Sequence, residues 1–435
     1  MTPSARLSAA IEVFADIEAR RRPAADVLKD WGLAHRFAGS GDRAAIAGLV
    51  YDALRRKSSA AWLMGEATPR AVLIGMLRRE RGLDVTAIAA LCSGARYAPA
   101  PLTEGEIAAL ASEALADAPA HVQGDYPDWL DAPLTRVFGE ERAAEGAALA
   151  SRAPLDLRVN TLAAEREAVL PKLAHLGAEA ARWSPIGLRI RLAADAKNPA
   201  VHAEPVFLKG EIEIQDEGSQ LAALLAGAKP GEQVVDLCAG AGGKTLALAA
   251  AMENRGQIYA TDTDKRRLVP IHERIARAGA RNIQVRTPRG AADVLGDIAG
   301  RADLVLIDAP CTGIGTWRRN PDAKWRIRPG ALAERLKQQQ AALERAVGLL
   351  KPGGRIAYVT CSVLAEENGD QVRAFAGRHP DFSVEKPANV INLLGERAYL
   401  FSRAVLISDE GLLMTPRRTD TDGFFVSLVQ RQLSS

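Results

Sequence analysis

The chain has 435 residues, of which 48% are hydrophobic, and this is enough for two or three domains with buried cores. Its formal net charge of +3 does not by itself indicate a nucleic-acid-binding protein, so that case rests on local clusters of basic residues. The cysteines at positions 92, 238, 311 and 361 form no C-x-x-C pair, which argues against a disulfide framework and against a zinc site.

The first residues, MTPSARLSAAIEVFADIEARRRP, carry acids within their apolar stretch and do not resemble a signal peptide. No run approaches the ~20 apolar residues of a membrane span. We therefore expect a cytoplasmic protein that binds neither membrane nor metal, and a monomer.

Residues 1–118 predict an all-α domain. Leu7, Ile11, Phe14 and Ile17 are spaced by three and four, as on one face of a helix. Basic clusters follow at 20–22, 55–57 and 78–81. Each cluster is either a solvated helix face or part of a surface that contacts the RNA backbone, and both interpretations remain open.

A loop rich in Ala, Pro and Gly, at about 114–127, predicts a domain boundary. Residues 127–204 then predict a small α+β module, with strands at 155–160 and 187–192 and a helix at 162–176. Arg189 and Arg191 alternate onto one face of the second strand, which is either a basic face or an ordinary solvated one.

From residue 205 to 435 the pattern becomes strand–helix–strand, which predicts a mostly parallel, doubly wound sheet. Two further segments, 411–415 and 424–429, come without helices and predict strands appended to one edge, either parallel or antiparallel to the sheet. The main strands are expected at 233–238, 257–261, 283–285, 304–307 and 355–360, and the helices at 243–253, 265–279, 331–350 and 365–378.

The stretch from Val234 to Lys244, VVDLCAGAGGK, predicts a strand, a glycine turn and a helix N-terminus. Ligands of open α/β sheets bind at such a turn. The dinucleotide pattern fails because Thr245 replaces its third glycine, and the P-loop pattern fails because Cys238 replaces its first. S-adenosylmethionine is the third candidate, and a turn without a ligand also remains possible.

Three other strand ends carry polar or reactive residues. Asp262 follows the second strand, about 20 residues beyond the glycines, where an acid can accept both ribose hydroxyls. Asp308-Ala309-Pro310-Cys311 follows the next long strand, and Thr360-Cys361-Ser362 follows the strand after that. Two cysteines are thus expected at the edge of the sheet where a ligand lies.

At this point the chain resembles the Sun/RsmB-type RNA cytosine-C5 methyltransferases, over the last half of its length. The N-terminal helices resemble the NusB-like domain of bacterial members. The segment LDLRVNT at 155–161 resembles the module that precedes the catalytic domain in this family. The matching segments are 215–220, Asp236-Leu237-Cys238 with 242–245, 308–311, 318–322, 360–362 with 366–368, and 422–425.

The resemblance implies a Rossmann-like methyltransferase domain that binds S-adenosylmethionine and modifies RNA, with small-subunit rRNA as the expected substrate. It implies that Cys361 is the nucleophile and that Cys311 assists breakdown of the covalent adduct. Asp308 is expected to contact the target base and the methyl-bearing end of the cofactor, and Lys244 the flipped nucleotide or the cofactor. The expected cofactor contacts are Cys238, Ala239, Gly240, Ala241, Gly242, Gly243, Lys244, Asp262 and Asp308.

Covalent catalysis explains the thiol. Carbon 5 of cytosine is a poor nucleophile, but a thiolate that adds to carbon 6 makes it an enamine that can attack a methyl group. The enzyme must take the base out of any stack. Cys361 precedes a helix expected to start near residue 365, which favours a thiolate, whereas Glu366 and Glu367 oppose it.

The segment from Trp317 to Arg326 interleaves basic residues with two tryptophans, a composition that suits single-stranded RNA. The alternative is that the two tryptophans pack the loop onto the protein.

Two positions depart from the family. Ala241 replaces a proline of the glycine turn, and Pro288 and Arg289 stand where the family has a Gly-Asp pair that contacts adenine; Asp293 is nearby but out of register. The second departure leaves a catalytically lost RNA-binding ribosome-assembly factor as an alternative function. A P-loop nucleotide hydrolase is a further alternative, disfavoured by Cys238.

Overall fold

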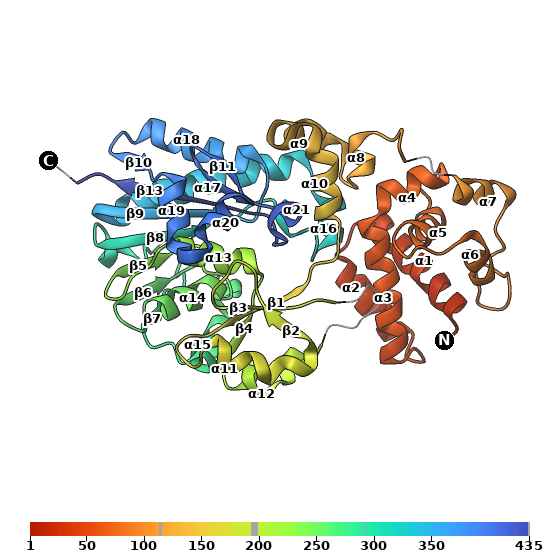
Figure 1. Ribbon diagram of the computed structural model, residues 1–435, viewed down its shortest axis with the longest axis horizontal. Coiled ribbons are helices and arrows are strands. Elements are labelled where there is room, and N and C mark those ends of the chain that lie inside the picture. Colours follow the sequence, from red (N-terminus) through yellow and green to blue (C-terminus); the bar gives the residue numbers. More distant parts are fainter. Residues whose placement is uncertain (113–114, 193–198, 291, 434–435) are drawn as a thin grey trace. The chain divides into compact units, whose positions relative to one another are not determined.

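The computed structural model describes residues 1–112, 115–192, 199–290 and 292–433. These residues divide into two compact units. Unit 1 holds the described residues up to Arg152 together with a distant segment, Trp317–Arg328, and unit 2 holds the remaining described residues. Figure 1 shows unit 1 as helical and unit 2 as a mixture of helices and strands.

Unit 1 is built from short helices whose starts are fixed by side-chain caps. Thr2 accepts a hydrogen bond from Ala5 N, Thr68 caps a second helix in the same way, and Thr103 with Glu106 forms a capping box. The helices are α1 (Pro3–Arg20), α2 (Ala24–Ala34), α3 (Ser40–Arg55), α4 (Lys57–Met64), α5 (Pro69–Arg79), α6 (Val85–Leu91), α7 (Glu104–Ala111), α8 (Ala120–Gln123), α9 (Asp131–Phe138), α10 (Arg142–Leu149) and α16 (Pro321–Arg326), with 3-10 turns η1 (Asp128–Leu130) and η2 (Gly139–Glu141).

The segment Trp317–Arg328 packs inside unit 1, so its interpretation as an exposed RNA-binding surface is wrong. Trp317, Arg318 and Lys324 are each at most 2% exposed. Lys324 Nζ donates to Arg55 O at 3.0 Å, and Trp325 Nε1 donates to Leu54 O at 2.6 Å. The alternative interpretation, in which the tryptophans pack the loop onto the protein, is the one that the structure supports.

Of the three basic clusters of unit 1, the one at 55–57 is engaged in the same packing, whereas Arg20, Arg21, Arg78 and Arg79 of the other two are exposed. Arg55 and Arg56 are buried or nearly so, and their guanidinium groups pair with Asp52 and with Glu80. Lys57 pairs with Glu18 on α1. The cluster at 55–57 is therefore part of the structure of unit 1 and is neither a solvated face nor an open RNA-binding patch.

Unit 2 begins with a small antiparallel sheet in the order β2-β3-β1-β4. Its strands are β1 (Leu155–Val159), β2 (Ala178–Ala180), β3 (Gly187–Ile190) and β4 (Ile212–Ile214), accompanied by α11 (Arg166–Val169), η3 (Leu170–Leu176), η4 (Val201–Ala203) and α12 (Pro205–Leu208). The helix expected at 162–176 is thus a short α-helix followed by a 3-10 helix, and β4 lies beyond residue 204, the proposed end of the module.

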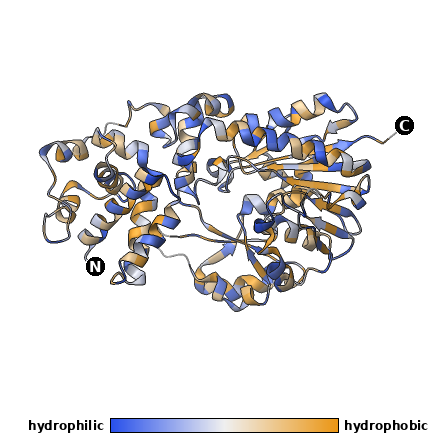
Figure 2. Ribbon diagram, turned by 180° about the vertical axis from the view of Figure 1, so that it is seen from behind, coloured by the Kyte–Doolittle hydropathy of each residue, from blue (hydrophilic) through white to orange (hydrophobic). Residues whose placement is uncertain are grey.

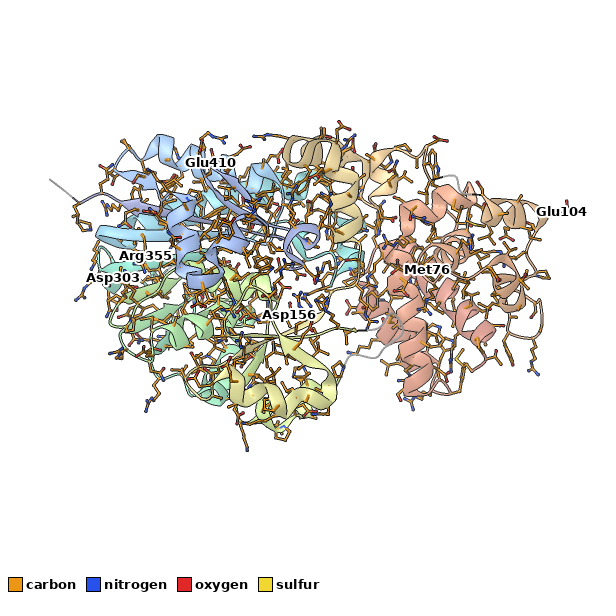
Figure 3. The ribbon with its side chains drawn as sticks, in the orientation of Figure 1. Met76, Glu104, Asp156, Asp303, Arg355 and Glu410 are labelled. Carbon is orange, nitrogen blue, oxygen red and sulfur yellow. The ribbon has the colours of Figure 1, made fainter. Side chains whose placement is uncertain are left out.

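Arg189 is neither on a basic face nor on a solvated one. Its side chain is 3% exposed and forms a bidentate pair with Asp156, which Figure 3 labels, and a second pair with Asp420. Arg191 is exposed and pairs with Glu179. Arg189 is therefore part of a buried ion-pair network, which links the small sheet through Asp156 to Asp420, a residue shortly before β13.

The described residues of unit 2 also form a nine-stranded sheet, which confirms the predicted α/β Rossmann-like class. Strands β7-β6-β5-β8-β9 run parallel, and β13, β12 and β11 continue antiparallel from β9, with β10 paired to β13. Their bounds are β5 (Gln233–Asp236), β6 (Gln257–Ala260), β7 (Ile283–Val285), β8 (Ala302–Asp308), β9 (Leu350–Thr360), β10 (Phe382–Val384), β11 (Leu406–Ser408), β12 (Gly411–Met414) and β13 (Phe424–Arg431).

The central strands β8 and β9 are apolar and buried along most of their length, as expected for strands covered by helices on both faces, and Figure 2 shows the sheet as largely hydrophobic. Figure 1 shows α13 and α14 on one side and α17 and α18 on the other. The helices are α13 (Glu217–Leu225), α14 (Gly243–Ala251), α15 (Ile271–Ala278), α17 (Pro329–Leu349), α18 (Gly369–Arg378), α19 (Pro387–Ile391), α20 (Ala398–Ser402) and α21 (Pro416–Thr419), with 3-10 turns η5 (Lys265–Leu268), η6 (Gly296–Ile298), η7 (Ile314–Thr316), η8 (Ala365–Glu367) and η9 (Asn392–Arg397).

The strand order fixes where a ligand can bind. β5 pairs with β6 on one side and with β8 on the other, so the chain reverses its direction of progress between β5 and β8. In open parallel sheets the ligand crevice lies outside the carboxyl ends of the strands at such a reversal. Within the described residues, no helix is long and apolar enough to cross a membrane.

Candidate active site

The glycine turn follows β5 and leads into α14 at the carboxyl edge of the sheet. Gly242 has a φ of 84° and caps α14, and a Cβ at this position would lie 2.4 Å from Ile271 Cγ1, so only glycine fits. Arg274 holds the turn from outside by donating to Ala241 O at 2.8 Å. Cys238, Ala239 and Gly240 complete the turn, as the sequence predicts.

Asp262 lies directly after β6 and beside the turn. Its carboxylate is 2% exposed, accepts a hydrogen bond from Gly240 N at 3.1 Å and pairs with Arg267 Nη1 at 3.1 Å. A buried acid fixed against a glycine turn is suited to accept ribose hydroxyls. Arg267, which sequence reasoning missed, neutralises this carboxylate in the structure.

Asp236 ends β5 beneath the turn. It accepts a hydrogen bond from Thr245 Oγ1 at 2.7 Å, while its Oδ1 is buried without a partner. Burial raises the pKa of Asp236 to about 7. Burial, with the charges of Asp236 and Asp308, also raises the pKa of the Cys238 thiol, which is therefore suited to contact a ligand rather than to act as a nucleophile.

The sulfurs of Cys311 and Cys361 lie 3.3 Å apart. Both residues are partly exposed, and they follow the ends of β8 and β9, which pair in parallel with Asp308 opposite Val359. Figure 3 labels Asp303, which lies near the amino end of β8, and Arg355, which lies within β9 opposite Leu304; both are at the far end of this strand pair from the cysteines. The two thiols that the sequence singles out therefore share one site.

The two sulfurs do not carry equivalent protons. The hydrogen bond with Cys361 and burial hold the pKa of Cys311 well above its ordinary value, and the charges of Cys361 and Glu367 add to this effect. A raised pKa favours the protonated thiol at Cys311, and at 3.3 Å either sulfur can donate the hydrogen bond. A protonated Cys311 suits Cys361 as the nucleophile.

Lys244 is buried in the site and is not a helix-surface lysine. Its side chain is 8% exposed, its Nζ lies 2.8 Å from Asp308 Oδ2, and it lies 5.0 Å from the centre of the Phe424 ring. Lys244 follows the glycine turn, where the cofactor is expected, and Asp308 ends β8, the strand that leads to Cys311. This ion pair therefore links the glycine turn to the loop that carries Cys311.

The turn that holds Cys361 is fixed by Asn368 and not by a helix N-terminus. Asn368 Oδ1 accepts from Thr360 Oγ1, and its Nδ2 donates to Ser362 O at 2.9 Å. The helix expected to start near residue 365 begins at Gly369, after the three-residue 3-10 turn η8. A helical turn thus starts at Ala365, as expected, but it is a 3-10 turn, and activation of Cys361 by a helix terminus stays a prediction.

Two acids follow β7 near the departure at Pro288 and Arg289, and the effect of that departure on adenine recognition stays a prediction. Asp293, the nearest acid after β7, is 64% exposed and pairs with Arg345, so it is directed elsewhere. Asp297 pairs with Arg286.

The residues present fit S-adenosylmethionine. The turn provides backbone N–H groups at the start of α14, Asp262 offers a ribose acceptor, and the Lys244–Asp308 pair lies toward the thiols. Among the described residues there is no group of three or more His, Cys, Asp or Glu side chains that could hold a metal ion.

Comparison with known proteins identifies the family. The model of the 16S rRNA methyltransferase RsmB/F family matches residues 222–430, and that of the RsmF/B-like ferredoxin-like domain matches 126–197. The chain is 31% identical over 312 residues to a probable ribosomal RNA small subunit methyltransferase B from Synechocystis sp., covering 71% of this chain and 67% of that one. It is 32% identical over 313 residues to the corresponding protein of Bacillus subtilis, covering 71% and 66%.

A solved structure agrees with this result. The crystal structure of a methyltransferase homologue from Pyrococcus horikoshii superimposes with a TM-score of 0.57 at 27% identity, covering 72% of this chain and 97% of that one. The chain spans about two thirds of the length of the two curated relatives. With its glycine turn and its paired cysteines in place, the chain belongs to the RsmB/F family of 16S rRNA methyltransferases.

Proposed function

We propose that the protein methylates carbon 5 of a cytosine in small-subunit ribosomal RNA, using S-adenosylmethionine. The observation that carries this proposal is the 3.3 Å approach of the Cys311 and Cys361 sulfurs, next to the crevice that holds the Lys244–Asp308 pair. The names of the curated relatives support rRNA of the small subunit as the substrate. We also propose that the protein acts in the cytoplasm and as a monomer.

The residues have distinct roles in this reaction. Cys361 Sγ adds to carbon 6 of the flipped cytosine, and the C5–C6 electron pair becomes available at carbon 5. S-adenosylmethionine, when bound by residues 238–244 and Asp262, supplies the methyl group that carbon 5 takes. Asp308 contacts the ring nitrogens of the base and is oriented by Lys244.

The test is transfer of a labelled methyl group to 16S rRNA, followed by mapping of 5-methylcytosine. We expect incorporation by the unaltered protein and none by Cys361→Ala. Full activity of Cys361→Ala would refute the covalent mechanism. Calorimetric titration with the cofactor tests the alternative, because absence of binding at millimolar concentration would favour an RNA-binding assembly factor that has lost catalysis.

A further inference from the structure

Glu367 is a buried carboxylate that no step of the mechanism above uses. It is fully buried. An unpaired buried carboxylate is costly unless several donors satisfy it. Its position between the two cysteine loops requires an explanation.

Three hydrogen bonds satisfy this carboxylate, and two of them come from the residue next to Cys311. Thr312 N donates to Glu367 Oε1 at 2.8 Å, and Thr312 Oγ1 donates to Oε2 at 2.5 Å. Gln339 Nε2, from α17, donates to Glu367 Oε1 and to Pro310 O, both at 3.0 Å. The backbone is therefore fixed on both sides of Cys311.

Glu367 is also joined to the turn that holds Cys361. Its own carbonyl accepts from Tyr358 OH at 2.6 Å, and the next residue, Asn368, fixes Thr360 and Ser362. One short segment after β9 thus holds the end of β8 and the end of β9 in register. The two loops joined by this clamp carry the sulfurs that lie 3.3 Å apart.

We propose that Glu367 is a positioning residue for the methyl transfer reaction, which fixes Cys311 against Cys361 and thereby governs breakdown of the covalent RNA adduct. This inference rests on the proposed function. Gln339 and Thr312 serve the same clamp. The adjacent glutamates of the 366–368 motif were noted in the sequence, but only the structure shows that one of them reaches the Cys311 loop.

The chemistry of release explains why the clamp matters at that step. Once Cys361 is bonded to carbon 6, its hydrogen bond and its charge no longer hold the proton on Cys311, and Cys311 loses that proton to solvent. The Cys311 sulfur then accepts the proton from carbon 5, the C5–C6 double bond forms again, and the C6–S bond breaks to return a thiolate to Cys361. The pair ends as one thiol and one thiolate, as it began.

The negative charge of Glu367 contributes to this step beyond geometry. It helps to raise the pKa of Cys311, so that the Cys311 thiolate is a stronger base toward carbon 5. Loss of the Glu367 charge is therefore expected to slow release of the RNA from Cys361 more than it slows attack of Cys361 on carbon 6. A role in folding alone would affect attack, release and cofactor binding together.

The test uses the full chain with Glu367→Gln, and Thr312→Val as a milder second variant in case the first fails to fold. The matched control is Glu334→Gln, an exposed carboxylate on α17 that accepts a hydrogen bond from Gln338 Nε2. We expect Glu367→Gln to reduce multiple-turnover methylation about tenfold, to accumulate covalent RNA–protein adduct on a denaturing gel, and to leave cofactor affinity unchanged. Single-turnover methyl transfer should change by less than about threefold, and the pH at which release becomes fast should fall.

A second measurement does not require methyl transfer. In the protein without RNA, alkylation by iodoacetamide and mass spectrometry should find Cys361 more reactive than Cys311, and Glu367→Gln should narrow this difference. An unchanged ratio, or equal losses of attack and release, would overturn the proposal. If the unaltered protein transfers no methyl group, the proposed function fails, and the alkylation ratio still decides whether Glu367 sets the state of Cys311.

Discussion

At the scale of single residues, the site depends on charges and thiols whose partners come from different strand ends. Lys244 pairs with Asp308, and Cys311 lies against Cys361. In each pair the two residues are far apart in the sequence, and neither would have its observed environment alone. Substituting one residue of a pair should therefore change the step that this residue serves, which the next two predictions test.

Cys311→Ser should trap a covalent RNA–protein adduct, because a serine hydroxyl is too weak a base to accept the carbon 5 proton at neutral pH. The adduct is measured on a denaturing gel with labelled RNA. Cys361→Ala is the control and should form no adduct. Absence of an adduct with Cys311→Ser, while methylation continues at the normal rate, would contradict the release role.

Lys244→Met should lower the rate of methyl transfer by about tenfold or more, because Asp308 loses the cation that orients it. The measurement is the single-turnover rate at saturating cofactor. Lys265→Met, at an exposed position in the same domain, is the control and should have little effect. An unchanged rate for Lys244→Met would show that the ion pair does not serve the reaction.

At the scale of elements, the loop after Cys311 is held by a close approach of two glycines. Gly315 N donates to Cys361 O at 2.9 Å, and Gly423 N donates to Gly315 O at 2.8 Å. A Cβ on Gly315 would lie 2.1 Å from Gly423 O, so the backbones could not keep this distance. The antiparallel strand β13 thus supports the catalytic loop from the side.

Gly315→Ala should lower the free energy of unfolding by about 2 kcal/mol or more and reduce methyl transfer, because the loop must move away from Gly423. Gly348→Ala is the matched control: a Cβ there meets nothing within 4 Å, and alanine favours the helix by about 0.5–1 kcal/mol. Thermal melts and initial rates of both variants check this. Equal behaviour of the two would contradict the clash.

At the scale of the whole molecule, unit 1 is completed by a segment from far along the chain. Lys324 is buried against Arg55 O, near the guanidinium groups of Arg55 and Arg56 and the carboxylate of Asp125. Burial lowers the pKa of Lys324 to about 7. The unfolded chain therefore binds one more proton than the folded chain between about pH 7 and the ordinary lysine value.

Because of this difference, the Lys324 contribution makes the folded state more stable as pH rises from about 7 to about 10, by at most about 1.4 kcal/mol per pH unit. Lys324→Met should flatten this slope. Urea unfolding at several pH values, followed by tryptophan fluorescence, measures it, since five of the six tryptophans lie in unit 1. An identical slope in the two proteins would contradict the prediction.

Local sequence patterns predicted much of unit 2 because strands and helices of a parallel sheet carry their own signals. The five parallel strands and the glycine turn lie close to the predicted positions, since apolar runs that end in glycine or aspartate mark strand ends directly. The short strands β2, β4, β10 and β11 were missed because three or four residues give no clear period. The proposed domain boundaries at 118, 127 and 204 remain proposals.

The sequence by itself determined the fold class, the family resemblance and the order of the reactive residues along the chain, because these depend on local composition and spacing. Only the tertiary structure decided which side chains meet: that Cys311 contacts Cys361, that Glu367 holds the loop between them, and that Trp317 and Lys324 are buried in unit 1. The physical reason is that burial and pairing depend on contacts between residues that are distant in the chain. A local sequence pattern does not reveal which charged or aromatic residues such contacts will bury.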